Sequence, residues 1–245
     1  MVKEISMIFL IGHVLGDYYF QTSGISQGKR NSLKLLTAHG VIYLCALTGC
    51  AGTVFGRAGV KCGLLLSITH VVIDYLKIFA DKHLNNRGQK NALIYIADQV
   101  IHILTIIGAA ILINMRGDIE GYAGWVCKLC SQLHISKAEM FAWIAALLLL
   151  ITPCCITIRI VLEGYRGEDA REGVENAGAL IGILERIIVL LLLSAGQYAA
   201  IGFILTAKSV ARYNKISEDA KFAEYYLLGT LLSTVMVLGV YRIIL

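Results

Sequence analysis

The stretch ALIYIADQVIHILTIIGAAILIN, residues 92–114, is apolar along most of its length and carries Asp98, Gln99 and His102 near its middle. A helix that crosses a bilayer needs about 20 mostly apolar residues. The stretch therefore predicts a transmembrane helix with an aspartate and a histidine inside the hydrocarbon layer. The rest of the chain also consists largely of long apolar stretches.

The composition of the whole chain indicates a membrane protein. Its 245 residues are 57% hydrophobic and only 16% charged, and the mean hydropathy is +0.71, whereas soluble domains are about 45–50% apolar and about 25% charged. Backbone groups in lipid must be paired internally, and long continuous apolar runs favour helices over barrel strands. We therefore expect an all-α, polytopic bundle of transmembrane helices. The net charge of +5 fits basic loops at a cytoplasmic face better than binding of nucleic acid.

The apolar stretches predict the positions of the spanning helices. The apolar stretch at 177–207 is too long for one ordinary span and short for two. Gly196 near its middle can form a tight turn. We therefore expect seven or eight membrane segments. The first one resembles a signal peptide, but it contains His13 and Asp17 and has no small-residue cleavage site, which predicts a retained helix. The predicted ranges are 5–21, 33–55, 58–80, 92–114, 137–162, 177–207 and 222–243.

The polar residues between the helices predict two halves and an orientation. Residues 1–115 form a four-helix half, and residues 116–245 form a C-terminal half of three or four helices with a charged cytoplasmic loop at 163–175. Basic residues concentrate in the first and third loops and the adjoining helix ends, which places these loops in the cytoplasm and the N-terminus outside. They are Lys29, Arg30, Lys34, Lys77, Lys82, Arg87 and Lys90, against Lys3, Arg57 and Lys61 on the opposite face.

Four histidines and three aspartates lie within the first four apolar segments. An ionised aspartate near the bilayer centre costs about 2.5–3.5 kcal/mol, so three unpaired ones would cost roughly 8–10 kcal/mol. These side chains therefore need partners. They are His13, His39, His70 and His102, with Asp17, Asp74 and Asp98.

The spacing of these residues predicts that they meet. Each aspartate lies four residues from a histidine, so the two share one helix face. The order is His-x3-Asp on the first and third segments and Asp-x3-His on the fourth, which runs in the opposite direction. This reversal keeps all three aspartates toward the same leaflet, and His39 enters the second helix from that side. We therefore expect all seven groups in one layer.

Three interpretations fit such a layer. The pairs can be hydrogen bonds that join helices, or they can form a pathway for protons or ions. They can also bind metal, because neutral imidazole and carboxylate groups are ligands for zinc, manganese and iron. The number of ligands suffices for one metal ion with supporting carboxylates, or for two ions.

Several further residues are candidates for substrate binding. Gln21 and Gln99 can orient a ligand or a water, and Arg186, Lys208 and Arg212 of the second half can hold a phosphate headgroup. Contact with anionic lipid explains the basic members of that half better than substrate binding does. The charged candidates for substrate binding in the second half are Glu185, Arg186, Lys208 and Arg212.

Small residues and cysteines carry weaker signals. The pairs Gly12/Gly16 and Gly178/Gly182 have a spacing that allows close contact between helices. Cys127, Cys130 and His134 have a spacing seen in metal sites and disulfides, although ordinary loop residues fit them better.

The motifs of the first half resemble a known family. The run HVLGDYYFQ at 13–21, His39, HVVID at 70–74 and DQxxH at 98–102 are similar to the bacterial membrane family called domain of unknown function 3307, over roughly residues 5–110. This resemblance implies a multi-pass protein of the bacterial inner membrane. The arrangement also resembles, more distantly, the predicted membrane-bound metal-dependent hydrolases, which implies a reaction class but no substrate.

The leading hypothesis is a membrane-embedded, metal-dependent hydrolase of a lipid-linked or phosphoester substrate. In it His13, His39, His70, Asp74 and His102 are the candidate metal ligands, and Asp17 and Asp98 are the candidate catalytic carboxylates. The alternatives are a proton- or ion-coupled transporter or channel that uses the same residues, and a structural membrane subunit. Membrane lipid is an expected partner and nucleic acid is not, and the sequence does not indicate the oligomeric state.

Overall fold

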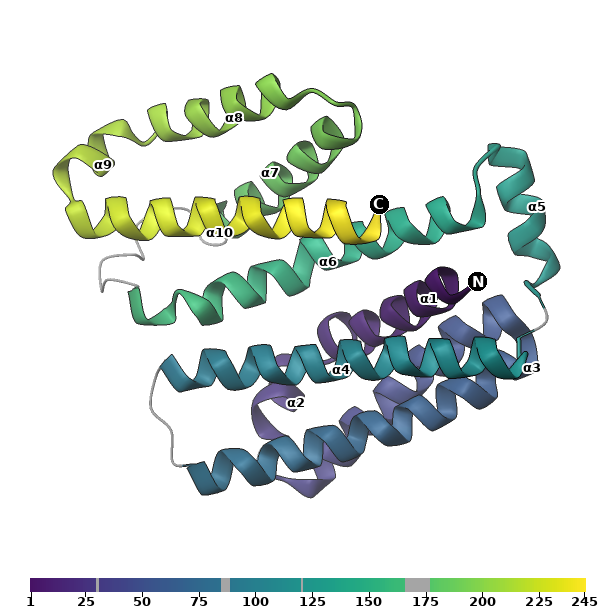
Figure 1. Cartoon of the computed structure of the whole chain (residues 1–245). Coiled ribbons are helices and arrows are strands. Elements are labelled where there is room, and N and C mark those ends of the chain that lie inside the picture. The colour runs from purple at the N-terminus through teal and green to yellow at the C-terminus, as the bar shows by residue number, and fades with distance from the viewer. Residues whose placement is uncertain (30, 85–88, 120, 166–176) are drawn as a thin grey trace. The chain divides into compact units, whose positions relative to one another are not determined.

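The computed structural model describes residues 1–29, 31–84, 89–119, 121–165 and 177–245, and within these ranges the regular structure is helical with no strand (Figure 1). This confirms the predicted all-α class. The described chain forms two compact units, Met1–Ala145 and Ala146–Leu245, whereas the sequence predicted halves that divide at residue 115. Some predicted features lie outside the described residues: Arg30, the linker 85–88 with Arg87, residues 166–175 of the charged loop, and the side chains of Lys82 and Lys90.

The first unit begins with a helix that changes its winding. α1 (Val2–Val14) continues directly into the π-helical turn η1 (Leu15–Tyr19), where Phe20 N donates to Leu15 O at 2.8 Å. Together they match the predicted segment 5–21. π-helical turns are rare in proteins, and those that occur are often found at functional sites. The short helix α2 (Ser23–Gly28) follows, and Thr22 caps it by accepting from Ile25 N.

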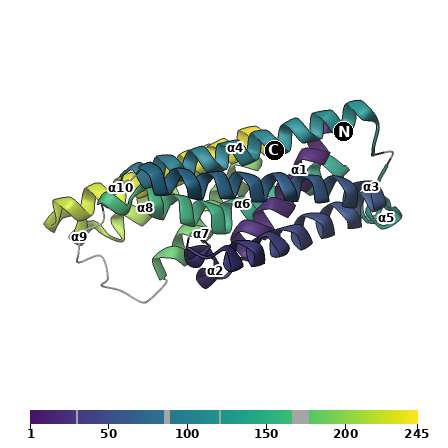
Figure 2. The ribbon, with the colours of Figure 1, turned by 90° about the horizontal axis from the view of Figure 1, so that it is seen from below.

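The next helix, α3 (Leu33–Leu84), is a hairpin of two helical arms. Gly56 has φ 64° and ψ −142°, a backbone conformation that favours glycine, and the chain reverses there. The arms are antiparallel, because Gly40 lies against Val71 and Gly63 lies against Thr48. This confirms the predicted helices 33–55 and 58–80. α4 (Gln89–Arg116) packs beside α3 and matches the predicted helix 92–114 (Figure 2).

The reversal at Gly56 leaves backbone carbonyls at the end of the first arm without helical donors. Ala123 N donates to Val54 O, and Trp125 Nε1 donates to Thr53 O, both at 2.8 Å. These donors lie at the start of α5 (Gly124–Leu133). A segment that is too short to span a membrane therefore caps the tip of the hairpin.

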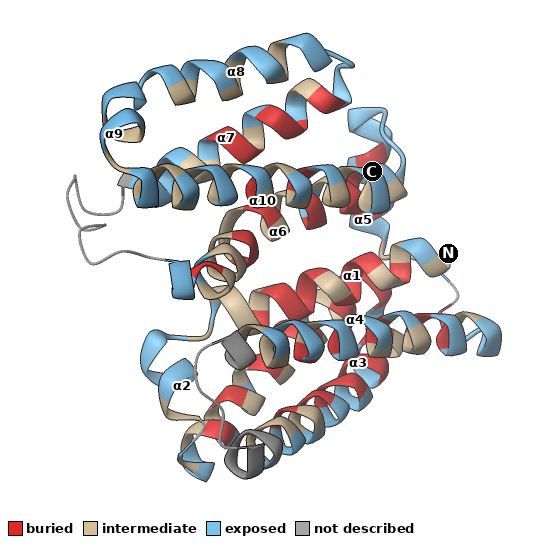
Figure 3. Ribbon diagram, turned by 60° about the vertical axis from the view of Figure 1, so that its left-hand side comes forward, coloured by how far each residue is buried: buried red, intermediate tan, exposed pale blue. Residues whose placement is uncertain are grey.

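α1 forms the centre of the first unit, as its buried surface shows in Figure 3. It contacts both α3 and α4. Gly12 and Gly16 allow this approach, since a Cβ atom would lie 3.0 Å from Leu47 Cα at Gly12 and 3.2 Å from Tyr43 Cα at Gly16. The predicted close contact at this glycine pair is confirmed.

The second unit contains the end of α6 (Lys137–Val161), the short 3-10 turn η2 (Glu163–Tyr165) and four further helices. The predicted turn at Gly196 is confirmed: this residue has φ 68° and separates α7 from α8. The spacing of Gly178 and Gly182 also allows close contact, but a Cβ atom at Gly178 would have no neighbour within 4 Å, and one at Gly182 would meet the Arg186 side chain. The four helices are α7 (Ala177–Ser194), α8 (Tyr198–Val210), α9 (Tyr213–Glu218) and α10 (Ala220–Ile244).

Four helices of the described chain are long and apolar enough to cross a membrane. The first of them contains both arms of α3, so it can supply two crossings. These helices are Leu33–Phe79, Ala92–Arg116, Lys137–Val161 and Ala220–Ile244. Their length and composition indicate membrane association.

Candidate metal centre

Four ligand atoms converge at the centre of the first unit. His39 Nε2 lies 3.1 Å from His70 Nε2, 3.2 Å from Asp17 Oδ1 and 3.3 Å from Asp74 Oδ2. His70 Nε2 lies 3.3 Å from Asp17 Oδ1 and 3.9 Å from Asp74 Oδ2. Two imidazoles and two carboxylates from different parts of the chain thus point at one another.

Four of these five separations, 3.1–3.3 Å, are close to those in a tetrahedral metal site. A zinc ion binds nitrogen and oxygen at roughly 2.0–2.2 Å, so its tetrahedral ligand atoms lie about 3.3 Å from each other. The spacing also suits other first-row metals that take imidazole and carboxylate ligands. The side chains are buried: His39 is 0% exposed, and His70 and Asp74 are each 2% exposed.

The fold places each of the four ligands. The hairpin at Gly56 sets His39 on the first arm of α3 opposite His70 and Asp74 on the second arm. The π turn η1 carries Asp17 to the same point. Because Gly16 permits η1 to lie directly against Tyr43, the Asp17 carboxylate can reach between the arms.

Asp17 also connects this group to His13. Its second oxygen, Oδ2, lies 3.9 Å from His13 Nε2. The Nδ1 atom of His13 lies 3.1 Å from the Tyr43 hydroxyl, and the Tyr43 ring stacks on His70 at a centroid distance of 3.5 Å. Tyr43 thus positions two histidines.

His102 and Asp98 on α4 complete the cluster. His102 Nδ1 lies 2.9 Å from the carbonyl oxygen of Asp98. A carbonyl only accepts, so Nδ1 carries the proton and Nε2 presents a lone pair. Metal-binding histidines are commonly oriented in this way. The ring of His102 lies 4.5 Å from that of His70 and 5.3 Å from that of His13, between centroids.

The structure therefore brings together all seven side chains that the sequence placed in one layer. Some of their atoms are buried and have no hydrogen-bond partner within the described chain, which is unusual for groups in an apolar environment. These include His13 Nε2, His102 Nε2 and Asp98 Oδ1. Lone pairs of this kind are suited to a ligand.

Two lysines contact the cluster from its outer side. Lys29 Nζ donates to Asp74 Oδ2, and Lys77 Nζ donates to Asp98 Oδ2, both at 2.7 Å. In the sequence both lysines belong to the basic residues of the loops and adjoining helix ends. For Lys77 a signal was available, because it lies three residues after Asp74 on the same helix face. Lys29 had no such signal.

Tyr43 was also missed as a site residue. It lies four residues after His39 and therefore shares its helix face, so the same spacing argument would have found it. Tyr18 and Tyr95 add a link nearby, with their hydroxyl oxygens 2.8 Å apart between η1 and α4.

The two glutamines support the cluster from its edge. Gln99 Nε2 donates to Asp98 Oδ2 at 3.1 Å. The Gln21 amide contacts backbone, where its nitrogen donates to Asp17 O at 2.9 Å and its oxygen accepts from Ser26 N at 3.3 Å. The structure thus places Gln99 against a carboxylate and Gln21 at the junction of η1 and α2.

The four predicted substrate residues of the second half lie in the second unit. Lys208 donates to Glu185 and to the Thr230 hydroxyl. Arg186 Nε donates to Leu150 O, and its Nη2 donates to Cys155 Sγ, both at 2.7 Å. Arg212 lies over the Phe222 ring at 5.9 Å. Their partners are thus residues of the same unit.

The cysteine pair lies on α5, away from any group of converging ligand atoms in the described chain. Cys127 is exposed and Cys130 is buried, with its sulfur 3.8 Å from Met140 Sδ. His134 ends the helix in a left-handed conformation and is exposed. The preferred interpretation as ordinary residues fits this arrangement.

Comparison with known proteins identifies the cluster-bearing region. Residues 5–120 match the model of a family described as "Protein of unknown function (DUF3307)", so this part of the chain is similar to that family. All seven cluster residues and both lysines fall within the match. No curated protein and no solved structure matches the chain.

Proposed function

We propose that this protein is a metal-dependent hydrolase of the bacterial inner membrane, acting on a lipid-linked or phosphoester substrate. In this proposal the chain crosses the bilayer seven or eight times. The spans are α1 with η1, the two arms of α3, α4, α6, α7, α8 and α10, of which α7 and α8 form one hairpin. The four long apolar helices support the membrane location.

One observation carries the proposal: the ligand atoms of Asp17, His39, His70 and Asp74 lie 3.1–3.9 Å from one another in the five pairs described above. Buried carboxylates and imidazoles at such distances are costly unless they are paired or bind a cation. We assign these four residues as the metal ligands. Asp17, first considered as a base, thereby becomes a ligand.

The remaining residues then surround the ion. His13 and His102 present free Nε2 atoms beside it, either as additional ligands or as proton acceptors for water. Asp98, held by Lys77 and Gln99, fixes the position of α4 in the site. A bound zinc, manganese or iron ion would supply Lewis acidity and lower the pKa of a bound water.

Metal content of the purified protein tests this proposal. The wild type in detergent is expected to retain about one equivalent of a divalent metal after dialysis, given affinities typical of such ligand sets. The variants Asp17→Asn and His39→Gln keep the shape of the side chain but remove a metal ligand, and we expect them to lose the ion. His134→Gln is the matched control, because His134 is exposed and outside the cluster.

Release of phosphate from phosphomonoesters and from phosphatidic acid in mixed micelles then tests the reaction class. Activity should require the metal and disappear in Asp17→Asn and His39→Gln. Equally low metal content in the wild type and in both site variants would refute the metal centre. Metal binding without hydrolysis of any phosphoester would refute the reaction class alone.

A second function is favoured by one specific observation. The contacts Lys29–Asp74–His39–Asp17–His70 form a continuous series of polar groups inside apolar helices, as relays for protons do. A proton- or ion-coupled transporter would show flux in liposomes that disappears in Asp74→Asn. Metal-independent flux of that kind would favour transport over hydrolysis.

A further inference from the structure

Lys29 and Lys77 are partly exposed cations in direct contact with two aspartates of the cluster. We propose that these two lysines bind an anionic phosphate group of the substrate once the metal ion is in place. This inference rests on the proposed metal centre and adds to it the residues that recognise the substrate, together with the chemical class of the group they recognise.

The two lysines occupy equivalent positions at the edge of the site. Each donates to an aspartate oxygen at 2.7 Å, Lys29 to Asp74 Oδ2 and Lys77 to Asp98 Oδ2. The lysine side chains are 15% and 19% exposed, whereas the aspartate side chains they contact are 3% and 5% exposed. The ammonium groups thus form the accessible layer, and the carboxylates lie beneath them.

The charges of the described cluster favour an anion in the metal-bound state. With neutral imidazoles, as metal ligands must be, the three aspartates and two lysines leave one negative charge. A divalent cation would reverse this to one positive charge. An excess charge inside apolar helices is unfavourable, so the metal-loaded site should attract an anion from outside.

The metal also changes the partners of Lys29. Asp74 Oδ2 accepts from Lys29 and lies 3.3 Å from His39 Nε2, so it is the oxygen that would bind the ion. A cation on this oxygen weakens the attraction of the carboxylate for the ammonium group. An ammonium group has three donors, and phosphate oxygens accept strong, charge-assisted hydrogen bonds.

A simpler role for the lysines is neutralisation of the aspartates alone. Both roles predict that Lys29→Gln binds metal more tightly, because a competing cation is removed. Only phosphate recognition predicts that the same variant binds phosphate less tightly. The two effects have opposite signs, so one protein preparation distinguishes them.

Calorimetric titration of the full-length protein in detergent provides the test. Zinc is added first, and inorganic phosphate is then titrated into the zinc-loaded protein. We expect Lys29→Gln and Lys77→Gln to bind phosphate about tenfold less tightly, as for the loss of a charge-assisted hydrogen bond. Lys29→Arg, which keeps the charge and the donors, should retain most of the affinity.

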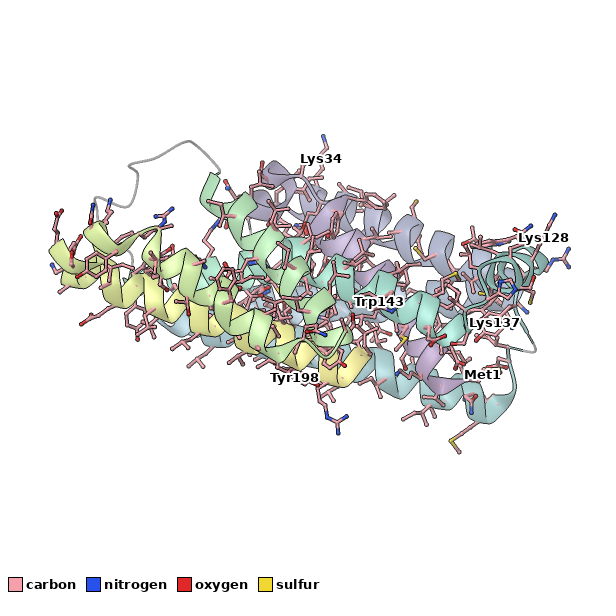
Figure 4. All side chains as sticks on the ribbon, turned by 90° about the horizontal axis from the view of Figure 1, so that it is seen from above. Met1, Lys34, Lys128, Lys137, Trp143 and Tyr198 are labelled. Carbon is pink, nitrogen blue, oxygen red and sulfur yellow. The ribbon has the colours of Figure 1, made fainter. Side chains whose placement is uncertain are left out.

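Lys34→Gln is the matched control. Lys34 lies at the start of α3, five residues after Lys29, and its exposed side chain extends away from the ribbon (Figure 4). It should change neither titration. The zinc step also reports the fold, because a misfolded variant would lose the metal as well. Phosphate affinity that is equal in the wild type, Lys29→Gln and Lys77→Gln would overturn the inference and leave the metal centre intact. Absence of zinc binding to the wild type would overturn both.

The phosphate group can belong to a lipid or to a soluble compound. Zinc-loaded protein in phosphatidylcholine vesicles, with or without phosphatidic acid, separates these sources. If phosphatidic acid competes with inorganic phosphate, the lysines receive a lipid headgroup. If it does not compete and phosphate still binds through the lysines, they receive a soluble phosphate. Phosphate binding that persists in Lys29→Gln/Lys77→Gln contradicts both.

Discussion

Six histidines and aspartates of the cluster in the first unit, and Glu185 and Arg186 of the second, are buried polar groups within apolar helices: His13, His39, His70, Asp74, Asp98 and His102. In the second unit Glu185 pairs with Lys208, and Arg186 donates to Leu150 O in the turn before Pro153, where a proline interrupts the helical hydrogen bonds. In the first unit His13 Nε2, His102 Nε2 and Asp98 Oδ1 have no partner in the described chain. Satisfied groups hold helices together, whereas unsatisfied ones indicate a ligand.

Loss of a ligand in the first unit should have the largest effect on metal binding. We expect His70→Gln to weaken zinc binding by more than about a hundredfold, since even residues that merely orient ligands contribute about 10–100-fold. Glu185→Gln in the second unit should leave zinc binding unchanged. Competition with a chelating dye measures both. If the two substitutions weaken zinc binding equally, the contrast between the units is lost.

Loss of one charge in the second unit should instead affect stability. Lys208→Met leaves Glu185 buried without its cation, and we expect a loss of about 3 kcal/mol, as for other broken buried pairs. The double variant Glu185→Gln/Lys208→Met should recover much of this loss. Unfolding in mixed micelles with increasing denaturing detergent measures the change. A double variant as unstable as Lys208→Met would argue against a purely structural pair.

The glycine pairs of the two units offer a matched comparison. In Gly16→Ala the new methyl group would lie 3.2 Å from Tyr43 Cα, and we expect a loss of about 1–3 kcal/mol. Because η1 would move away from α3, zinc affinity should also fall. Gly178→Ala meets open space and should be neutral or slightly stabilising. Thermal unfolding with and without zinc measures both effects, and a zinc affinity unchanged in Gly16→Ala would show that η1 does not set the position of Asp17.

The smallest effect should come from a residue that only orients ligands. Tyr43→Phe keeps the ring stacked on His70 and removes the hydroxyl that lies 3.1 Å from His13 Nδ1. We expect a loss of about 1 kcal/mol in stability and about tenfold in zinc affinity. Tyr165→Phe is a suitable control, because Tyr165 is exposed in the second unit. Equal zinc affinity in Tyr43→Phe and the wild type would assign Tyr43 a packing role alone.

Spacing and direction made the cluster predictable from the sequence. The fourth segment runs antiparallel to the first, so the reversed order of Asp98 and His102 predicted that they lie beside His13 and Asp17. Contacts between side chains of different elements could not be predicted from the sequence. Lys29 reaches Asp74 from the turn after α2, and no periodicity connects the two. The short helices α2, α5 and α9 were not predicted either, because a helix of six to ten residues gives no hydropathy signal.

The hairpin of α3 has a consequence for how the protein is made. Gly56 reverses the chain within an otherwise continuous helix, so there is no hydrophilic loop to carry across the bilayer between the arms. The two arms can therefore enter the membrane as one piece during synthesis. Asp17, His39, His70 and Asp74 all precede α4 in the chain, so the segment that carries these four side chains is synthesised before Asp98 and His102.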